Sequence, residues 1–229
     1  RVAAHYYNHA LEHGYEPVLQ YKDGIPDDVA VLDVERGKLD HLREHYWQTD
    51  TSVSYKSWCY IETDDFRTIT SVVHDLVDIV SKNGNLLLNI GPRPDGTIPQ
   101  EVRDILVGLG RWLEVNGEAI YGTRPWHVYG EGPTEVPETR FAEKEYEPFT
   151  SADVRFTTTD GTLYAICLGW PHQELTIRSL RSGESPAVGS VSMLGSREPL
   201  AWTQGSDGLR IEVPADRPCD HAYVFAITL

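Results

Sequence analysis

Apolar residues recur at two different spacings along the first half of the chain. Three stretches place them every three or four residues, which predicts amphipathic helices; these stretches cover residues 1–14, 66–80 and 102–113. Shorter runs with the character of strands stand between them, at residues 17–21, 29–34, 46–49 and 85–90. Strands that alternate with helices form a parallel sheet, either open or closed into a barrel.

The number of strands limits the size of this sheet. A complete barrel of eight strands and eight helices needs about 200 residues or more, whereas the alternating pattern covers roughly the first 125 residues. The sequence therefore predicts about half of a barrel. An isolated half-barrel exposes two sheet edges and a large apolar surface, so we expect it to associate with a missing N-terminal half.

The pattern changes after Pro125-Trp126, and the rest of the chain consists of short strands and turns. A long polar connection is expected at 130–150, followed by a hairpin around Asp160-Gly161. Strands are predicted at 154–158, 163–169, 175–180, 189–194, 209–213 and 222–228. This pattern is typical of an antiparallel β-sandwich, and we predict two domains, residues 1–127 and 128–229.

The net charge of the chain makes some classes of binding partner unfavourable. Its 229 residues include 35 acidic and 20 basic side chains, a formal net charge of −15. Such a surface repels nucleic-acid backbones and anionic lipids, and no apolar run reaches the roughly 18 residues of a membrane span. We expect neither a nucleic acid nor a membrane as a partner. Neutral sugars are compatible with this charge, and the 6 Trp and 12 Tyr suit sugar stacking, although most are expected in the core.

Cysteine and histidine give no sign of a disulfide framework or a metal site. Cys59, Cys167 and Cys219 are widely spaced, and the 9 His are scattered along the chain. We predict no metal site and no cofactor. The chain begins at Arg1 with neither an initiator Met nor a signal peptide, which suggests a start in mid-domain and leaves the localisation open.

Functional residues of a parallel barrel gather where its strands end. Asp33–Gly37 follows a predicted strand, and an acidic side chain there either protonates a leaving group or only caps a helix or turn. The loop Ser57–Tyr60 offers an aromatic face to a sugar or covers the core. Asn85–Pro92 places Asn residues around a Leu run, and these residues either support neighbouring loops or tie the sheet together.

Several motifs resemble those of one enzyme family. They are Val31-Leu32-Asp33-Val34-Glu35-Arg36-Gly37, Ser57-Trp58 with Tyr60, Lys82 to Pro92 with Asp95-Gly96, Trp112 to Trp126, and Leu163 to Trp170. Together they span nearly the whole chain, and they are similar to the α-L-fucosidases of glycoside hydrolase family 29. One departure is Cys59, where relatives have Gly, and it is expected to shift its loop slightly.

The resemblance implies a fold and a reaction. The fold is the C-terminal half of a distorted (β/α)8-like barrel followed by an antiparallel β-sandwich. The reaction is exo-hydrolysis of terminal α-L-fucose from glycans with retention. Retaining enzymes use one carboxylate to attack the anomeric carbon, and a second carboxyl group to protonate the leaving oxygen and then activate water.

The resemblance also suggests site residues. Glu35 matches the family's acid/base glutamate in the loop after this strand, and Asp33, two residues away on the same strand face, remains an alternative. Many relatives carry Glu where this chain has Gln48, which cannot act as an acid and so favours Glu35. Trp58 falls where the family places an aromatic contact to fucose. Lys22 matches a cationic fucose contact of some relatives, or is a solvated turn lysine.

The attacking Asp of the family lies at the end of the strand before the helix expected at 1–14, and therefore upstream of Arg1. We expect the isolated chain to be inactive on fucosides. Its expected partners are fucosylated oligosaccharides or glycoconjugates and the N-terminal half of the catalytic domain. Two other functions stay open: a non-catalytic glycan-binding module, and a structural half of a split enzyme. The sequence is also compatible with a homo-oligomer.

Overall fold

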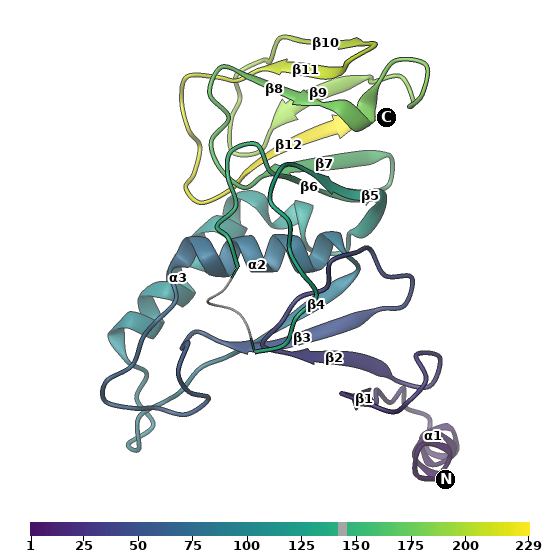
Figure 1. Cartoon of the computed structure of the whole chain (residues 1–229), viewed down its shortest axis with the longest axis vertical. Helices are drawn as coiled ribbons and strands as arrows, with labels where there is room; N and C mark the ends of the chain where they lie inside the picture. The colour runs from purple at the N-terminus through teal and green to yellow at the C-terminus, as the bar shows by residue number, and fades with distance from the viewer. Residues whose placement is uncertain (142–145) are drawn as a thin grey trace.

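The computed structural model describes residues 1–141 and 146–229, arranged as Figure 1 shows. The N-terminal elements are α1 (Val2–His13), β1 (Gln20–Tyr21), β2 (Val31–Glu35), β3 (Trp47–Ser52), α2 (Ile69–Ser81), β4 (Gly84–Asn89) and α3 (Gln100–Asn116). The C-terminal elements are the 3-10 helix η1 (Gly117–Ala119), β5 (Arg124–Glu131), β6 (Val154–Thr159), β7 (Thr162–Cys167), β8 (Glu174–Ile177), the 3-10 helix η2 (Arg178–Leu180), β9 (Ser190–Met193), β10 (Trp202–Gly205), β11 (Gly208–Glu212) and β12 (Tyr223–Thr228). The three predicted helices and the alternation of strands and helices are confirmed. Within the described ranges, no helix has both the length and the apolar character needed to cross a membrane.

The first four strands form a parallel sheet in the order β1-β2-β3-β4. Successive side chains of a strand point to opposite faces of its sheet. One face is apolar and packs against α2, with Val34 and Trp47 in its core. The register aligns Asp33 with Gln48 and Gln48 with Asn85, so polar side chains lie next to one another across the sheet.

Helix α2 packs against both parts of the molecule (Figure 1). It begins after Thr68, whose side chain accepts a hydrogen bond from the Ser71 N–H, as helix N-caps do. The chain leaves the helix through Asn83, which has a left-handed φ of 71°, so the predicted stop at this residue is confirmed. Val73 and Val77 face the antiparallel strands, while another side of the helix covers the parallel sheet.

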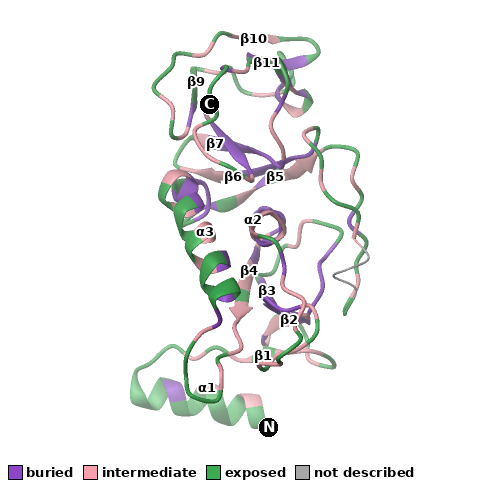
Figure 2. Cartoon of the chain, turned by 90° about the vertical axis from the view of Figure 1, so that its left-hand side faces the viewer, coloured by how far each residue is buried: buried purple, intermediate pink, exposed green. Residues whose placement is uncertain are grey.

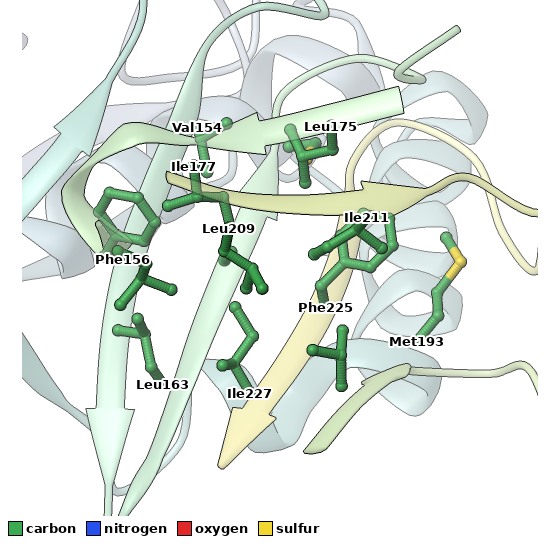
Figure 3. Close-up of a cluster of buried hydrophobic side chains, with 14 of the residues drawn as sticks. Val154, Phe156, Leu163, Leu175, Ile177, Met193, Leu209, Ile211, Phe225 and Ile227 are labelled. Atoms are coloured by element: carbon green, nitrogen blue, oxygen red, sulfur yellow. The ribbon is translucent and has the colours of Figure 1, made fainter. Parts of the chain in front are cut away.

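Two antiparallel sheets form a β-sandwich in the C-terminal part, in the orders β5-β6-β7-β12-β9 and β10-β11-β8. Figure 3 shows the apolar side chains between them, among which Phe156, Ile177 and Phe225 are fully buried. The other face of the five-stranded sheet packs against α2 and α3. The run from Leu163 to Leu168 is therefore buried throughout, because alternate residues enter two different cores.

Three strand predictions need correction. The strand expected at 17–21 is reduced to the two residues that pair with β2. The sequence did not predict β10, an edge strand in which partly exposed residues alternate with exposed ones, so it has no apolar run. The polar connection expected at 130–150 begins only after β5, which ends at Glu131. Part of that connection, residues 142–145, lies outside the described residues.

A buried ion cluster joins α2 to the five-stranded sheet. The Asp78 side chain is 0% exposed and accepts hydrogen bonds from Lys82 Nζ at 2.9 Å and Arg155 Nε at 2.6 Å. Lys82 follows α2 and Arg155 lies on β6, so one carboxylate of the helix holds cations from two parts of the chain. Such a cluster fixes how the helix sits against the sheet.

A second buried carboxylate on α2 predicts how stability depends on pH. Asp75 pairs with Lys38 at 2.5 Å and with Arg67. Burial alone would raise the pKa of Asp75, but the charges of Arg67 and Lys38 outweigh it and lower the pKa to about 2. Because the folded pKa lies below the ordinary value of 3.8, this stabilisation is complete above about pH 4 and is lost as the pH falls toward 2.

We expect Asp75 to contribute about 2 kcal/mol of pH-dependent stability, of which about 1 kcal/mol disappears between pH 5 and pH 3. Urea unfolding at these two pH values measures it. Asp75→Asn should be less stable than the wild type at pH 5, but it should lose less stability on acidification. The exposed control Asp207→Asn should follow the wild type. An Asp75→Asn protein as pH-sensitive as the wild type would contradict this assignment.

Candidate active site

The polar face of the parallel sheet brings one ammonium group among three carboxylates. Lys22 follows β1, and its Nζ lies 3.0 Å from Asp33 Oδ2, 3.2 Å from Glu35 Oε2 and 3.0 Å from Asp50 Oδ1. Asp33 and Glu35 lie two residues apart on β2, and the parallel register aligns Glu35 with Asp50 of β3. The strands thus collect these four side chains at their carboxyl ends, where active sites of parallel α/β folds lie.

Lys22 stays charged in this position. Burial alone would lower the pKa of Lys22, but its hydrogen bonds with Asp33, Asp50 and Glu35 outweigh this effect and raise the pKa. The Lys22 side chain is nevertheless 42% exposed. The cluster is therefore accessible to a ligand while it holds a permanent positive charge.

A hydrogen-bonded row across the sheet orients Asp33. Asn85 Nδ2 donates to Gln48 Oε1 at 3.2 Å, and Gln48 Nε2 donates to Asp33 Oδ1 at 3.1 Å. Since Lys22 contacts the other oxygen, both oxygens of Asp33 are engaged, and its side chain is only 9% exposed. Glu35 has a more exposed side chain, at 25%. Of these two carboxylates, Glu35 is the more available to a ligand.

Arg36 connects the end of β2 to the aromatic loop. Its guanidinium carbon lies 4.2 Å from the centroid of a Trp58 ring, within the range of a cation–π contact. The same guanidinium donates to the carbonyl oxygens of Ser54 and Ser57, at 2.9 and 3.2 Å. Asn89 Nδ2 donates to the Trp58 carbonyl at 2.8 Å. The loop that carries Trp58 is thus fastened both to the residue after Glu35 and to the end of β4.

Comparison with known proteins connects this geometry to a family. A family model described as alpha-L-fucosidase matches residues 8–118, and one described as the alpha-L-fucosidase C-terminal domain matches residues 147–228. The chain belongs to the α-L-fucosidase family.

The alignments with α-L-fucosidases of other organisms cover most of this chain. It is 35% identical to tissue alpha-L-fucosidase of Mus musculus over 199 residues, which are 85% of this chain and 40% of that protein. It is 33% identical to the Homo sapiens tissue enzyme over 199 residues, 85% of this chain and 39% of that one. The crystal structure of Thermotoga maritima alpha-fucosidase with a mechanism based inhibitor matches at a TM-score of 0.74 and 28% identity, covering 99% of this chain and 48% of that one. The chain spans about 40% of the length of these curated α-L-fucosidases.

The structure brings together some, but not all, of the site residues predicted from the resemblance to α-L-fucosidases. Lys22, Asp33 and Glu35 lie together, whereas the Trp58 ring contacts Arg36, the residue after Glu35, and not the Lys22 cluster itself, as far as the described contacts go. The sequence did not suggest Asp50 as a member of the cluster. Its signal was the unbroken polar run from Gln48 to Ser52, but its partners become visible only from the register of β2 and β3.

No described residue of this cluster belongs to a group of metal ligands. Among the described residues, one group of three possible ligands has its donor atoms within 4.8 Å, and it consists of Asp40, His41 and Glu138, all exposed. A cavity of about 1530 Å³ lies in the C-terminal part, beside His172 and Arg178, and not at the Lys22 cluster. The groups that the described residues bring together around Lys22 are three carboxylates and one ammonium group.

Gly91 is a position where the fold of this chain leaves no room for a side chain. An added Cβ would lie 2.8 Å from the Tyr60 nitrogen and 2.9 Å from the Cys59 carbonyl carbon, both backbone atoms of the Trp58 loop. We expect Gly91→Ala to displace this loop and to lower the free energy of unfolding by about 1–3 kcal/mol, as overpacking does.

Gly110→Ala is the control for this substitution. Gly110 lies in helix α3, and an added Cβ meets nothing within 4 Å, so this change should stabilise the protein by about 0.5–1 kcal/mol. Urea unfolding of both variants gives the comparison. Equal stability of the two variants would show that the backbone of the Trp58 loop yields to an added Cβ at Gly91.

Proposed function

We propose that this chain supplies the acid/base half of the active site of a retaining exo-α-L-fucosidase. The observation that carries the proposal is the position of Glu35, which combines a partly exposed carboxyl group with a place at the end of a parallel strand. Membership of the α-L-fucosidase family supplies the substrate class, which is glycans that end in α-L-fucose.

The reaction takes two steps. A carboxylate from a part of the family fold that this chain does not span attacks the anomeric carbon, while the Glu35 carboxylic acid gives its proton to the departing glycosidic oxygen. A covalent fucosyl ester results. The Glu35 carboxylate then takes a proton from water, whose oxygen attacks the same carbon and releases fucose. Retaining enzymes place the two carboxyl groups about 5–5.5 Å apart.

Glu35 is preferred to Asp33 as the acid/base because of their different surroundings. Gln48 and Lys22 engage both oxygens of Asp33, whose side chain is almost buried. Glu35 contacts Lys22 at 3.2 Å, the longest of the three contacts of this ammonium group. Glu35 is therefore the less tightly held of the two carboxylates and the more available to the glycosidic oxygen.

Lys22 and Trp58 are proposed as fucose contacts. Lys22 can release Glu35 and donate to a sugar hydroxyl while it keeps its contacts with Asp33 and Asp50. Trp58 offers an apolar ring surface to the region of the fucose C5-methyl group. The contacts of Arg36 to the loop reduce the freedom that this ring would lose on binding.

The parallel sheet is proposed to be the C-terminal half of a (β/α)8-like barrel, with residues 1–127 as the barrel part and 128–229 as the sandwich domain. This division falls inside β5, which pairs with β6 of the sandwich. The remaining half would pair with the outer strands β1 and β4. The exposure of Val18 and Leu87, at 65% and 53%, is consistent with such a cover.

An assay with an aryl α-L-fucoside tests the proposal. The chain is measured alone and together with a polypeptide that corresponds to the N-terminal part of the relatives. Turnover is expected only from the combination. Full turnover by the chain alone would overturn the proposed division of the site. Fucose binding without turnover in the combination, unchanged by Glu35→Gln, would instead support a non-catalytic glycan-binding role.

A further inference from the structure

Helix α1 carries three His residues spaced by one helical turn, His5, His9 and His13. Residues four apart lie on the same side of a helix. All three are exposed, and Figure 2 shows α1 as a largely exposed helix at one end of the molecule. Along the sequence the 9 His residues are scattered, and this pattern predicts no metal site. The helix nevertheless places these three in one row.

His9 and His13 are the closer pair of this row. Their ring centroids lie 4.0 Å apart at an interplanar angle of 15°, whereas the His5 and His9 rings are 6.2 Å apart and inclined by 56°. Two zinc–nitrogen bonds of about 2.0–2.1 Å at the tetrahedral angle span about 3.3 Å between the nitrogens. Chelation therefore requires the two exposed rings to turn out of this stacked arrangement until one nitrogen of each reaches the same ion.

The hydrogen bonds of His9 and His13 involve Nδ1 of each ring, so Nε2 is the nitrogen available to a metal. His13 Nδ1 lies 2.8 Å from the His9 carbonyl oxygen. A carbonyl can only accept, so Nδ1 carries the proton in that bond and Nε2 of the neutral ring carries the lone pair. His9 Nδ1 lies 3.0 Å from the Tyr15 hydroxyl, and the tautomer that donates to this oxygen also has its lone pair on Nε2. Metal-binding His rings are usually oriented in this way, by a hydrogen bond from their other nitrogen.

We propose that His9 and His13 chelate a divalent late transition-metal ion through their Nε2 atoms, with water completing the coordination. Imidazole ligands suit Zn²⁺, Ni²⁺ and Cu²⁺, and two His residues one turn apart on a helix are the pair that helical zinc motifs use. The site is formed by α1 and Tyr15 alone. It does not depend on the proposed fucosidase function.

Isothermal titration of ZnCl₂, and separately NiCl₂, into the full chain tests this site. The informative variants are His9→Ala and His13→Ala, and the matched controls are His5→Ala in the same row and His41→Ala in the group with Asp40 and Glu138. The four replaced side chains are exposed, and Ala favours helix more than His does, so α1 should persist. Circular dichroism checks that it does.

The expected result is a weakening of metal affinity by about 10- to 100-fold in His9→Ala and in His13→Ala, since each loses the chelating pair. His5→Ala and His41→Ala should stay within about threefold of the wild type, because neither contributes to that pair. Unchanged affinity in His9→Ala and His13→Ala would overturn the proposal. So would a loss confined to His41→Ala, or an equal loss in all four variants.

Discussion

Replacing Asp78 with Asn is expected to lower the free energy of unfolding by about 3–5 kcal/mol, the range found when one partner of a buried ion pair is removed. The Asp78 side chain is 0% exposed, and its two cations are almost as deeply buried, at 1% for Lys82 and 4% for Arg155. Without the carboxylate, these cations would stay buried without compensation. A loss of this size is a large fraction of the stability of an ordinary domain.

The charge states support this expectation. Burial alone would raise the pKa of Asp78, but the charges of Lys82 and Arg155 outweigh it and lower the pKa. The carboxylate is therefore ionised near neutral pH. Its removal also affects the contact between α2 and β6, because Arg155 lies on that strand.

Urea unfolding of Asp78→Asn at neutral pH measures the effect. The matched control is Asp207→Asn, which removes a carboxylate from the exposed pair with Arg210. Exposed pairs contribute little, so the control should lose no more than about 1 kcal/mol. The cluster would have no special structural importance if Asp78→Asn lost no more stability than this control.

Replacing Glu35 with Gln is expected to reduce kcat/KM of the assembled enzyme on natural fucosides by about 10²–10⁴-fold, the usual contribution of a general acid/base. Gln keeps the size of the side chain but cannot exchange a proton. Because Glu35 is partly exposed and its partner Lys22 keeps two other carboxylates, stability should change by no more than about 1 kcal/mol. The loss should therefore be confined to activity.

The leaving group distinguishes Glu35 from the alternative acid, Asp33. An aryl fucoside with an acidic phenol needs little protonation, so Glu35→Gln should impair the first step of its cleavage much less than that of a natural glycan. Asp33→Asn should impair both substrates to a similar degree, because Asp33 positions Lys22. If Asp33→Asn alone showed the dependence on the leaving group, Asp33 would be the acid/base.

Much of the fold followed from local patterns, and the exceptions have physical causes. The buried strands and amphipathic helices of the first half were predictable, since two-sided burial and helical spacing leave clear traces in the sequence. Strand β10 was not predicted, because an edge strand with no buried residue needs no apolar pattern. β5 was not predicted because its residues after Trp126 are mixed in polarity, and it pairs with β6 across a long connection.

Site residues that follow a predicted strand could be predicted from the sequence. Those whose neighbours depend on how the strands pair could not. Glu35 directly follows the strand predicted at 29–34 and is the last residue of β2, and Trp58 stands in a loop after the strand predicted at 46–49, so their candidacy needed no structure. Asp50 lies inside β3, and its place beside Lys22 depends on the pairing of Glu35 with Asp50, which one sequence does not reveal. The role of Arg36 was equally hidden, because it depends on a stacking contact with a residue 22 positions later.

A crystal structure of this chain assembled with the N-terminal part and bound to fucose tests the central claim most directly. We expect the Glu35 carboxyl group to lie within hydrogen-bonding distance of the anomeric oxygen, and about 5–5.5 Å from a carboxylate of the added part. Trp58 should contact the same sugar. A structure in which Glu35 turns away from the bound fucose, and another carboxyl group of the chain lies at the anomeric oxygen, would rule out Glu35 as the acid/base.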